Sequence, residues 1–102
     1  MSHITLTATL VAKPETRADL LALLMAQVAP SRADQGCTNY DLHVDAKDPC
    51  VFMFYENWAS RADLEAHAKM PHLKALRARA DELLAQPIKL VFYKMLSDGV
   101  GA

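Results

Sequence analysis

The sequence predicts an α+β fold in which two helical segments cover one face of a four-stranded antiparallel sheet. The chain has 102 residues, about the size of one domain, and 52% of them are hydrophobic against 23% charged. Its hydrophobic periodicity follows the order strand, helix, strand, strand, helix, strand. This order is the split βαβ, or ferredoxin-like, pattern. We therefore expect a single domain over residues 1–102, with a core at about 4–96 and a flexible tail at 97–102.

The first strand and the first helix follow one another directly. Residues 4–12 alternate between aliphatic side chains and threonines or other small residues, and a period of two is typical of a half-buried strand. Pro14 ends this strand and suits the first turn of a helix. From about 15 to 32 apolar residues recur at three- and four-residue spacing, which predicts an amphipathic helix. Gly36 marks its exit.

The two middle strands flank a predicted turn at residues 45–49. Residues 37–45 alternate between apolar and polar side chains, whereas residues 51–58 are apolar on both faces except at Glu56 and Asn57. A strand that is apolar on both sides lies in a sheet covered twice. The helices of so short a chain can cover only one face. We therefore expect a homodimer in which a second copy packs sheet to sheet.

The second helical segment begins at a capping-box pattern, in which Ser60 is followed three residues later by Asp63. Pro71 interrupts this helix, or restarts it at its own first position. An apolar stripe continues to Gln86, and residues 88–96 form the last predicted strand.

Charge and composition exclude several classes of protein. Eleven basic and twelve acidic residues give a formal net charge of −1, so the chain lacks the basic surface of a nucleic-acid-binding protein. No apolar run approaches 18 residues, and we expect neither a membrane-spanning helix nor a secretory signal. Cys37 and Cys50 flank the hairpin and would lie on the order of 20 Å apart, too far for a disulfide. Free thiols suit a reducing compartment, and we expect a cytoplasmic protein.

No familiar catalytic or cofactor motif is present in the sequence. A Gly-rich phosphate loop and the patterns G-x-S-x-G, C-x-x-C and H-E-x-x-H are all absent. We therefore expect no cofactor and no metal ion. The remaining candidates lie around the end of the third strand and in the second helical segment: Glu56, Trp58, His67 and His72.

Glu56 shares a strand face with the aromatic residues Phe52, Phe54 and Trp58. A carboxylate among aromatic rings needs a hydrogen bond or a charge partner, because an unpaired buried charge is too costly. It is a candidate for a perturbed pKa and for the polar anchor of a pocket. The alternative is a half-solvated carboxylate at the strand end, which accepts hydrogen bonds from the turn at residues 60–61.

His67 follows Leu64 by three residues and should point from its helix towards the sheet. An imidazole in a pocket could exchange protons near neutral pH, and the alternative, which is the commoner case for a lone histidine on an apolar face, is a packed core histidine. His72 could line the pocket, lie on the surface or contact a partner. A metal site from His67, His72 and Glu56 is conceivable, but histidines five residues apart across a proline are no recognised ligand pattern.

Three spaced motifs run through the chain: Gly36-Cys37-x-x-Tyr40-Asp41-Leu42-His43, Phe52-x-x-Tyr55-Glu56-x-Trp58 and Leu64-x-x-His67-x-x-x-Pro71-His72. Together they resemble the antibiotic biosynthesis monooxygenase family and its quinol monooxygenase members. The resemblance implies a dimeric α+β barrel, a cavity between sheet and helices, and oxygenation without flavin, haem or metal. It places His67 in that cavity and assigns Glu56 and Trp58 to the strand-end signature. Asn57 departs from the often basic residue of the family, which leaves the substrate open.

The leading functional hypothesis is a cofactor-independent monooxygenase that oxidises an electron-rich aromatic substrate, a quinol or polyphenol, with dioxygen. Because triplet dioxygen reacts slowly with closed-shell molecules, the substrate would have to lose a proton and supply the electron itself. We expect His67, or His72 in its place, to move the proton and Glu56 to be the orienting or polar partner of His67. The residues expected to bind the substrate are Trp58, Phe52, Phe54 and Thr7.

Two other functions stay open from the sequence. An isomerase of a small phosphorylated signalling sugar would require a cationic cluster, for which Arg77 and Arg79 are the nearby candidates. The third hypothesis is a non-catalytic dimer that binds a small molecule or acts as a stress protein.

Overall fold

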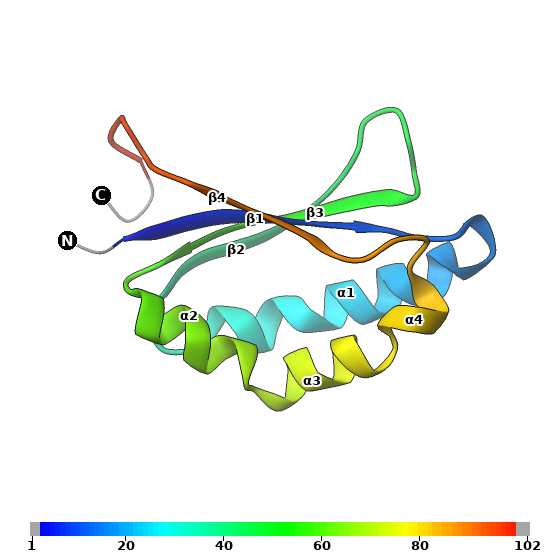
Figure 1. Cartoon of the computed structure of the whole chain (residues 1–102), viewed down its shortest axis with the longest axis horizontal. Helices are drawn as coiled ribbons and strands as arrows, with labels where there is room; N and C mark the ends of the chain where they lie inside the picture. Colours follow the sequence, from blue (N-terminus) through cyan, green and yellow to red (C-terminus); the bar gives the residue numbers. More distant parts are fainter. Residues whose placement is uncertain (1–2, 100–102) are drawn as a thin grey trace.

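A computed structural model describes residues 3–99 and shows one antiparallel sheet with every helix of that range on the same face (Figure 1). The elements are β1 (Ile4–Val11), the 3-10 turn η1 (Pro14–Thr16), α1 (Arg17–Arg32), β2 (Cys37–Val44), β3 (Val51–Trp58), α2 (Arg61–Ala68), α3 (Pro71–Ala78), α4 (Ala80–Leu83) and β4 (Lys89–Tyr93). The strands lie in the order β2-β3-β1-β4. This arrangement confirms the predicted ferredoxin-like α+β fold.

The core lies between the sheet and the helices and is built from alternate residues of the two central strands. β1 pairs with β3 along its whole length, from Ile4 opposite Trp58 to Val11 opposite Val51. Residues of these strands that face the helices are at most 7% exposed: Leu6, Ala8, Leu10, Phe52, Phe54, Glu56 and Trp58. Leu20 and Leu24 of α1 are completely buried against them. The alternation of residues in the sequence therefore identifies correctly which side chains of these strands face the core.

The second helical segment is more broken than the sequence predicts. Pro71 begins α3, as expected, but a break precedes the short helix α4, and the chain at Leu84 is extended. Leu84 forms a bridge with Ala12, just beyond β1, and is 7% exposed. The predicted helix to residue 86 is therefore wrong. Leu84 belongs to the apolar stripe, but it is buried by an extended segment that follows the end of the helix.

The last strand is also shorter than predicted, Lys89–Tyr93 instead of residues 88–96. Of the expected tail at 97–102, residues 100–102 lie outside the described range. Cys37 and Cys50 are free, as predicted. Burial raises the pKa of the Cys37 thiol to about 11, so this thiol is a poor nucleophile at neutral pH. No helix within residues 3–99 is long and apolar enough to cross a membrane.

The face of the sheet away from the helices, here called the open face, carries no helix within residues 3–99. Figure 1 shows the β2–β3 hairpin and the segment after β4 rising from opposite ends of this face. By strand alternation it presents Thr5, Thr7 and Thr9 of β1, and Met53 and Tyr55 of β3. Some of these side chains are only half-buried in a single chain.

Candidate functional site

A cavity of about 220 Å³ lies between the sheet and helices α2 and α3. Apolar side chains form most of its wall, and four residues bring polar groups to it: Tyr40, Glu56, His67 and Arg77. Leu90 of β4 also lines the wall although it is 54% exposed, so the cavity opens towards the β4 edge of the sheet. Since an apolar cavity of about 150 Å³ can hold benzene, this one has room for a small aromatic molecule.

Glu56 brings a buried carboxyl group to the cavity from β3. The residue is 4% exposed, and its Oε1 accepts a hydrogen bond of 3.0 Å from the indole Nε1 of Trp58. Burial raises the pKa of Glu56 to about 7, and the indole hydrogen bond offsets only part of that rise. The alternative of a half-solvated carboxylate bonded to the turn at residues 60–61 is wrong. The Ser60 hydroxyl at that turn caps α2 and bonds only with Asp63.

His67 of α2 lines the same cavity and is 4% exposed. Its ring packs on Trp58, with centroids 4.4 Å apart, and meets Tyr40 edge-on at 5.4 Å. Its Nδ1 lies 2.7 Å from Oδ2 of Asp34, in the loop between α1 and β2. Asp34, and not Glu56, is thus the hydrogen-bond partner of this ring nitrogen, whereas Glu56 shares the cavity wall with His67.

Burial lowers the pKa of His67 below its ordinary value, and the hydrogen bond and charge of Asp34 oppose this shift only in part. At neutral pH the imidazole is therefore uncharged. The pKa values of Glu56 and His67 are thus shifted in opposite directions. Glu56 tends to keep its proton, and His67 tends to stay neutral.

His72 lies beside this pair but outside the cavity wall. It is in the first turn of α3, and its side chain is 14% exposed. Its Nε2 lies 3.0 Å from the same oxygen of Asp34 that bonds His67, and the two imidazole rings are 5.8 Å apart.

The loop that carries Asp34 is fixed against the start of α2. The carbonyl of Gly36 accepts a hydrogen bond of 2.8 Å from the amide of Ala59. Gly36 has a φ of 80°, in the left-handed region. A Cβ at this position would overlap the carboxylate of Asp63, in the first turn of α2. A glycine therefore allows the close approach that brings Asp34 to the two histidines.

Of the expected substrate-binding residues, Phe54 lines the cavity. Phe52 and Trp58 are at most 1% exposed and belong to the surrounding core instead. The expectation that Thr7 faces the cavity is wrong: Thr7 pairs with Tyr55 and Val91, while its neighbours in β1 line the cavity. Alternation along the strand therefore turns Thr7 towards the open face.

The donor atoms of Asp34, His67 and His72 all lie within 4.8 Å of one another. The sequence had suggested a different combination, with Glu56 in the place of Asp34. Both histidine nitrogens already hydrogen-bond to the carboxylate, so a metal ion could enter only if both hydrogen bonds were broken. The arrangement is that of a hydrogen-bonded cluster.

Sequence reasoning missed Asp34, and no sequence signal marks it. The residue is separated from the two histidines by 33 and 38 positions, so no motif spacing connects them. The sequence marks Tyr40 only as one residue of a motif, yet its buried ring lies 4.5 Å from that of Phe54 in the cavity wall.

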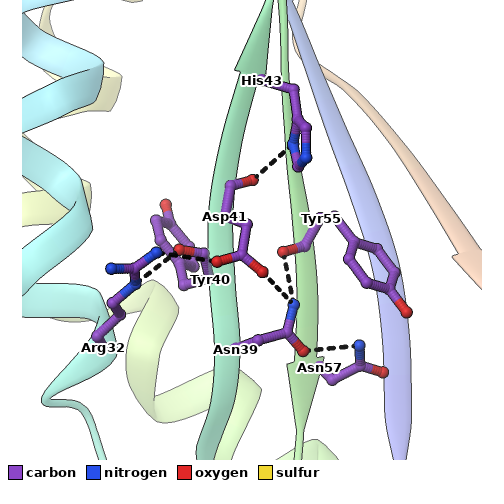
Figure 2. A network of polar contacts seen from close by, with 7 residues as sticks. All are labelled: Arg32, Asn39, Tyr40, Asp41, His43, Tyr55 and Asn57. Carbon is purple, nitrogen blue, oxygen red and sulfur yellow. Dashed lines mark hydrogen bonds and ion pairs between the residues drawn. The ribbon is translucent and has the colours of Figure 1, made fainter. Parts of the chain in front are cut away.

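A second polar network lies on the open face and is separate from the cavity (Figure 2). The side-chain amide of Asn57, completely buried, donates to Oδ1 of Asn39 at 2.8 Å. Asn39 in turn donates to Asp41 and to the carbonyl of Tyr55, and Arg32 pairs with Asp41 at 2.9 Å. This network links β2 to β3 beside the register shift that follows Cys37. It explains the burial of Asn57 as a structural role.

Comparisons with known proteins agree with this fold. A family model described as antibiotic biosynthesis monooxygenase matches residues 3–79. The Rv0793 protein of Mycobacterium tuberculosis is 34% identical over 97 residues, which are 95% of each chain. Its solved structure has a TM-score of 0.89 and matches 95% of this chain and 98% of its own.

Two further relatives extend the comparison. A solved structure of an antibiotic biosynthesis monooxygenase is 31% identical, with a TM-score of 0.86, over 92% of this chain and 99% of that one. The Synechocystis protein sll1783 is 31% identical over 83 residues, 81% of this chain. The chain spans only 56% of the length of that relative.

Proposed function

We propose that this chain, which belongs to the antibiotic biosynthesis monooxygenase family, oxidises a small electron-rich aromatic substrate, a quinol or polyphenol, with dioxygen and without a cofactor. One observation carries the proposal: a largely apolar cavity holds an uncharged imidazole and a carboxyl group whose pKa is about 7. Pairs of titratable groups whose environments push their pKa values apart are typical of acid and base partners in catalysis.

In the proposed reaction His67 is the base and Glu56 the acid. His67 accepts the proton of a substrate hydroxyl, and the resulting aryloxide gives one electron to dioxygen. The two radicals combine to form a carbon–oxygen bond, and Glu56 protonates the distal oxygen of the peroxide. Cleavage of the O–O bond and loss of the proton on that ring carbon leave a carbonyl and release water. One oxygen atom thus enters the product, and the substrate loses two hydrogens to the other.

The apolar wall serves this chemistry by excluding water. Charges that develop in the cavity interact more strongly with Glu56 and His67 than they would in bulk solvent. The rings of Tyr40 and Trp58 pack against the imidazole of His67, with centroids 5.4 Å and 4.4 Å away. The base therefore needs little reorganisation when the substrate enters.

The isomerase alternative receives no support from the cavity. A phosphate group would need several cations, and Arg79 is instead paired with Glu82 at 3.0 Å. Within the described residues Arg77 is the arginine or lysine of the cavity wall. One exposed guanidinium in the cavity wall suits the phenolic oxygen of a substrate better than a phosphate.

We also propose that a second copy of the chain covers the open face. The half-buried side chains of Met53 and Tyr55 on that face support this proposal. So does the exposed apolar surface at its β4 side, where Tyr93, paired with Thr5 on the same face, is 54% exposed and Leu96, beyond the strand, is 94% exposed. A second copy would bury both groups.

The function is tested by oxygen uptake with a panel of quinols in buffer that contains a chelator and no flavin. We expect one dioxygen consumed per substrate, with one oxygen atom from ¹⁸O₂ in the product and no hydrogen peroxide. His67→Gln should abolish the uptake, while Lys74→Gln, an exposed change on α3, should leave it unchanged. No uptake with any quinol, or uptake that requires added metal or flavin, would contradict the proposal.

A further inference from the structure

Asp34 accepts hydrogen bonds from two histidines through one oxygen atom. Oδ2 lies 2.7 Å from Nδ1 of His67 and 3.0 Å from Nε2 of His72. The carboxylate is 8% exposed, and the two imidazoles are 4% and 14% exposed. These three groups come from the loop before β2, from α2 and from α3, so the fold brings them together from separate parts of the chain.

The position of the carboxylate determines which nitrogen of His67 carries the hydrogen. An ionised carboxylate only accepts, and a neutral imidazole carries one hydrogen. With Nδ1 donating to Asp34, the lone pair of His67 is on Nε2. That nitrogen makes no hydrogen bond with any residue in the range 3–99, and the ring lines the cavity.

We propose that Asp34 and His72 are positioning residues for His67. Asp34 keeps the hydrogen on Nδ1, so that Nε2 can accept a proton from a molecule in the cavity. His72 shares the same carboxylate oxygen and so reduces the tendency of Asp34 to favour the doubly protonated form of His67. The inference rests on the proposed function, in which His67 is the base. Asp34 and His72 act through His67, because neither lines the cavity.

The role of His72 follows from the shared oxygen. A buried carboxylate that accepts a hydrogen bond from a single imidazole favours the imidazolium form of that imidazole. An imidazole that is already doubly protonated cannot act as a base. A second donor on the same oxygen spreads the negative charge over two hydrogen bonds. His72 therefore helps to keep His67 uncharged while Asp34 still fixes its orientation.

The groups around His67 act on its protonation in different directions. The charge of Arg77 on α3 lowers the pKa of His67, as does His72, and Asp34 raises it. Glu56 lies in the cavity wall on β3, and Tyr40 on β2 meets the ring edge-on. Asp34 is thus the carboxylate in direct hydrogen-bond contact with the imidazole.

The test measures the ring nitrogens of His67 by NMR on ¹⁵N-histidine-labelled full-length protein, over a range of pH. We expect the wild-type neutral form to carry its hydrogen on Nδ1. Asp34→Asn should shift hydrogen to Nε2 in part of the molecules and lower the pKa of His67 by about one unit or more, because the negative charge is gone.

A matched pair of variants tests His72. His72→Leu removes the second donor, and we expect the pKa of His67 to rise while its hydrogen stays on Nδ1. His72→Gln offers an amide donor in a similar place and should keep the pKa near the wild-type value. An equal effect of both variants, or none from Leu, would overturn the role of His72. Should Asp34→Asn fail to fold, this pair still tests the shared carboxylate.

The same spectra separate a failure of the inference from a failure of the function. Expected spectra together with no quinol oxidation would refute the proposed reaction and leave the positioning role intact. Oxidation by the wild type with unchanged His67 signals in Asp34→Asn would refute the positioning role alone. Zinc binding at one per chain that replaced the Nδ1 hydrogen would also overturn it, since the cluster would then be a metal site.

Where turnover is measurable, the inference predicts a split between kinetic constants. Asp34→Asn should lower kcat, since Nε2 of His67 carries the hydrogen in part of the molecules and cannot accept a proton there. KM should change much less, because Asp34 does not line the cavity. A loss confined to KM would contradict a positioning role.

Discussion

The indole of Trp58 donates a hydrogen bond of 3.0 Å to the carboxyl group of Glu56, two residues before it on the same face of β3. Both residues are at most 4% exposed, so this is a buried polar pair within an aromatic strand. The hydrogen bond satisfies the indole N–H and one oxygen of the acid, and it leaves the other oxygen without a partner among the described residues. That oxygen belongs to a group that lines the cavity.

The buried Glu56 makes the stability of the protein depend on pH. Because its pKa is raised in the folded state to about 7 from an ordinary 4.5, the folded protein binds more protons than the unfolded chain between these values. The free energy of unfolding should therefore fall as the pH rises through this window, by at most about 3 kcal/mol.

Glu56→Gln removes this dependence and keeps an acceptor for the indole. We expect the variant to be more stable than the wild type at pH 8 and similar to it at pH 4.5, as measured by urea unfolding. A wild type whose Glu56 contribution rose with pH would mean that the carboxylate has a partner the cavity does not show.

Replacement of His67 tests whether its imidazole takes part in the reaction or only packs in the core. His67→Ala should lower turnover by about 10²–10⁴-fold, the usual effect of removing a positioned proton acceptor, while the binding of a substrate analogue changes far less. The wild-type rate should fall as the pH drops through the pKa of His67, which burial lowers, and this limb should be absent in the variant.

Turnover and melting temperature of His67→Ala should be measured on one preparation. A less stable protein with full activity per folded molecule would mean that His67 only packs against Trp58 and Tyr40. A stable and fully active protein would exclude both roles for His67.

The fold follows from local patterns, whereas the site depends on contacts that are remote in sequence. Strand periodicity, Pro71 at the start of α3 and the cap at Ser60 are local features, and the structure confirms each of them. The resemblance of motifs placed His67 in the cavity. The partner of His67 could not be found in this way, because Asp34 reaches it only through a loop held by Gly36.

The errors have physical causes of the same kind. Leu84 continues an apolar stripe of helical spacing, yet it is buried by bridging to Ala12 after the helix has ended. Thr7 was assigned to the cavity although the aliphatic side of β1 faces the helices. A single strand shows which residues share a face, but the layer that covers each face is known only from the whole sheet.

The open face provides a test of the expected homodimer. Light scattering at micromolar concentration should give twice the 11.3 kDa of one chain, and the interface should bury more than about 2,000 Å² in total, as in obligate dimers. Met53→Asp, which places a charge at the centre of the open face, should unfold the protein. Ala75→Asp, an exposed change on α3, is the control and should have little effect. A stable monomer in the wild type would refute sheet-to-sheet packing.

Replacement of Gly36 tests whether the backbone conformation of its loop positions Asp34 in the site. A Cβ at position 36 would overlap the Asp63 carboxylate, and the φ of 80° disfavours any L side chain. Gly36→Ala should therefore destabilise the protein by about 1 kcal/mol or more, measured by chemical unfolding. Gly99→Ala is the matched control, because the Cβ there would meet only the flexible side chain of Met95.

In the folded fraction of Gly36→Ala, the loop must move away from α2 and take Asp34 with it. The hydrogen on Nδ1 of His67 should then lose its acceptor and shift towards Nε2, as in Asp34→Asn. Retention of both stability and the His67 spectrum would show that the close approach at Gly36 does not fix the loop.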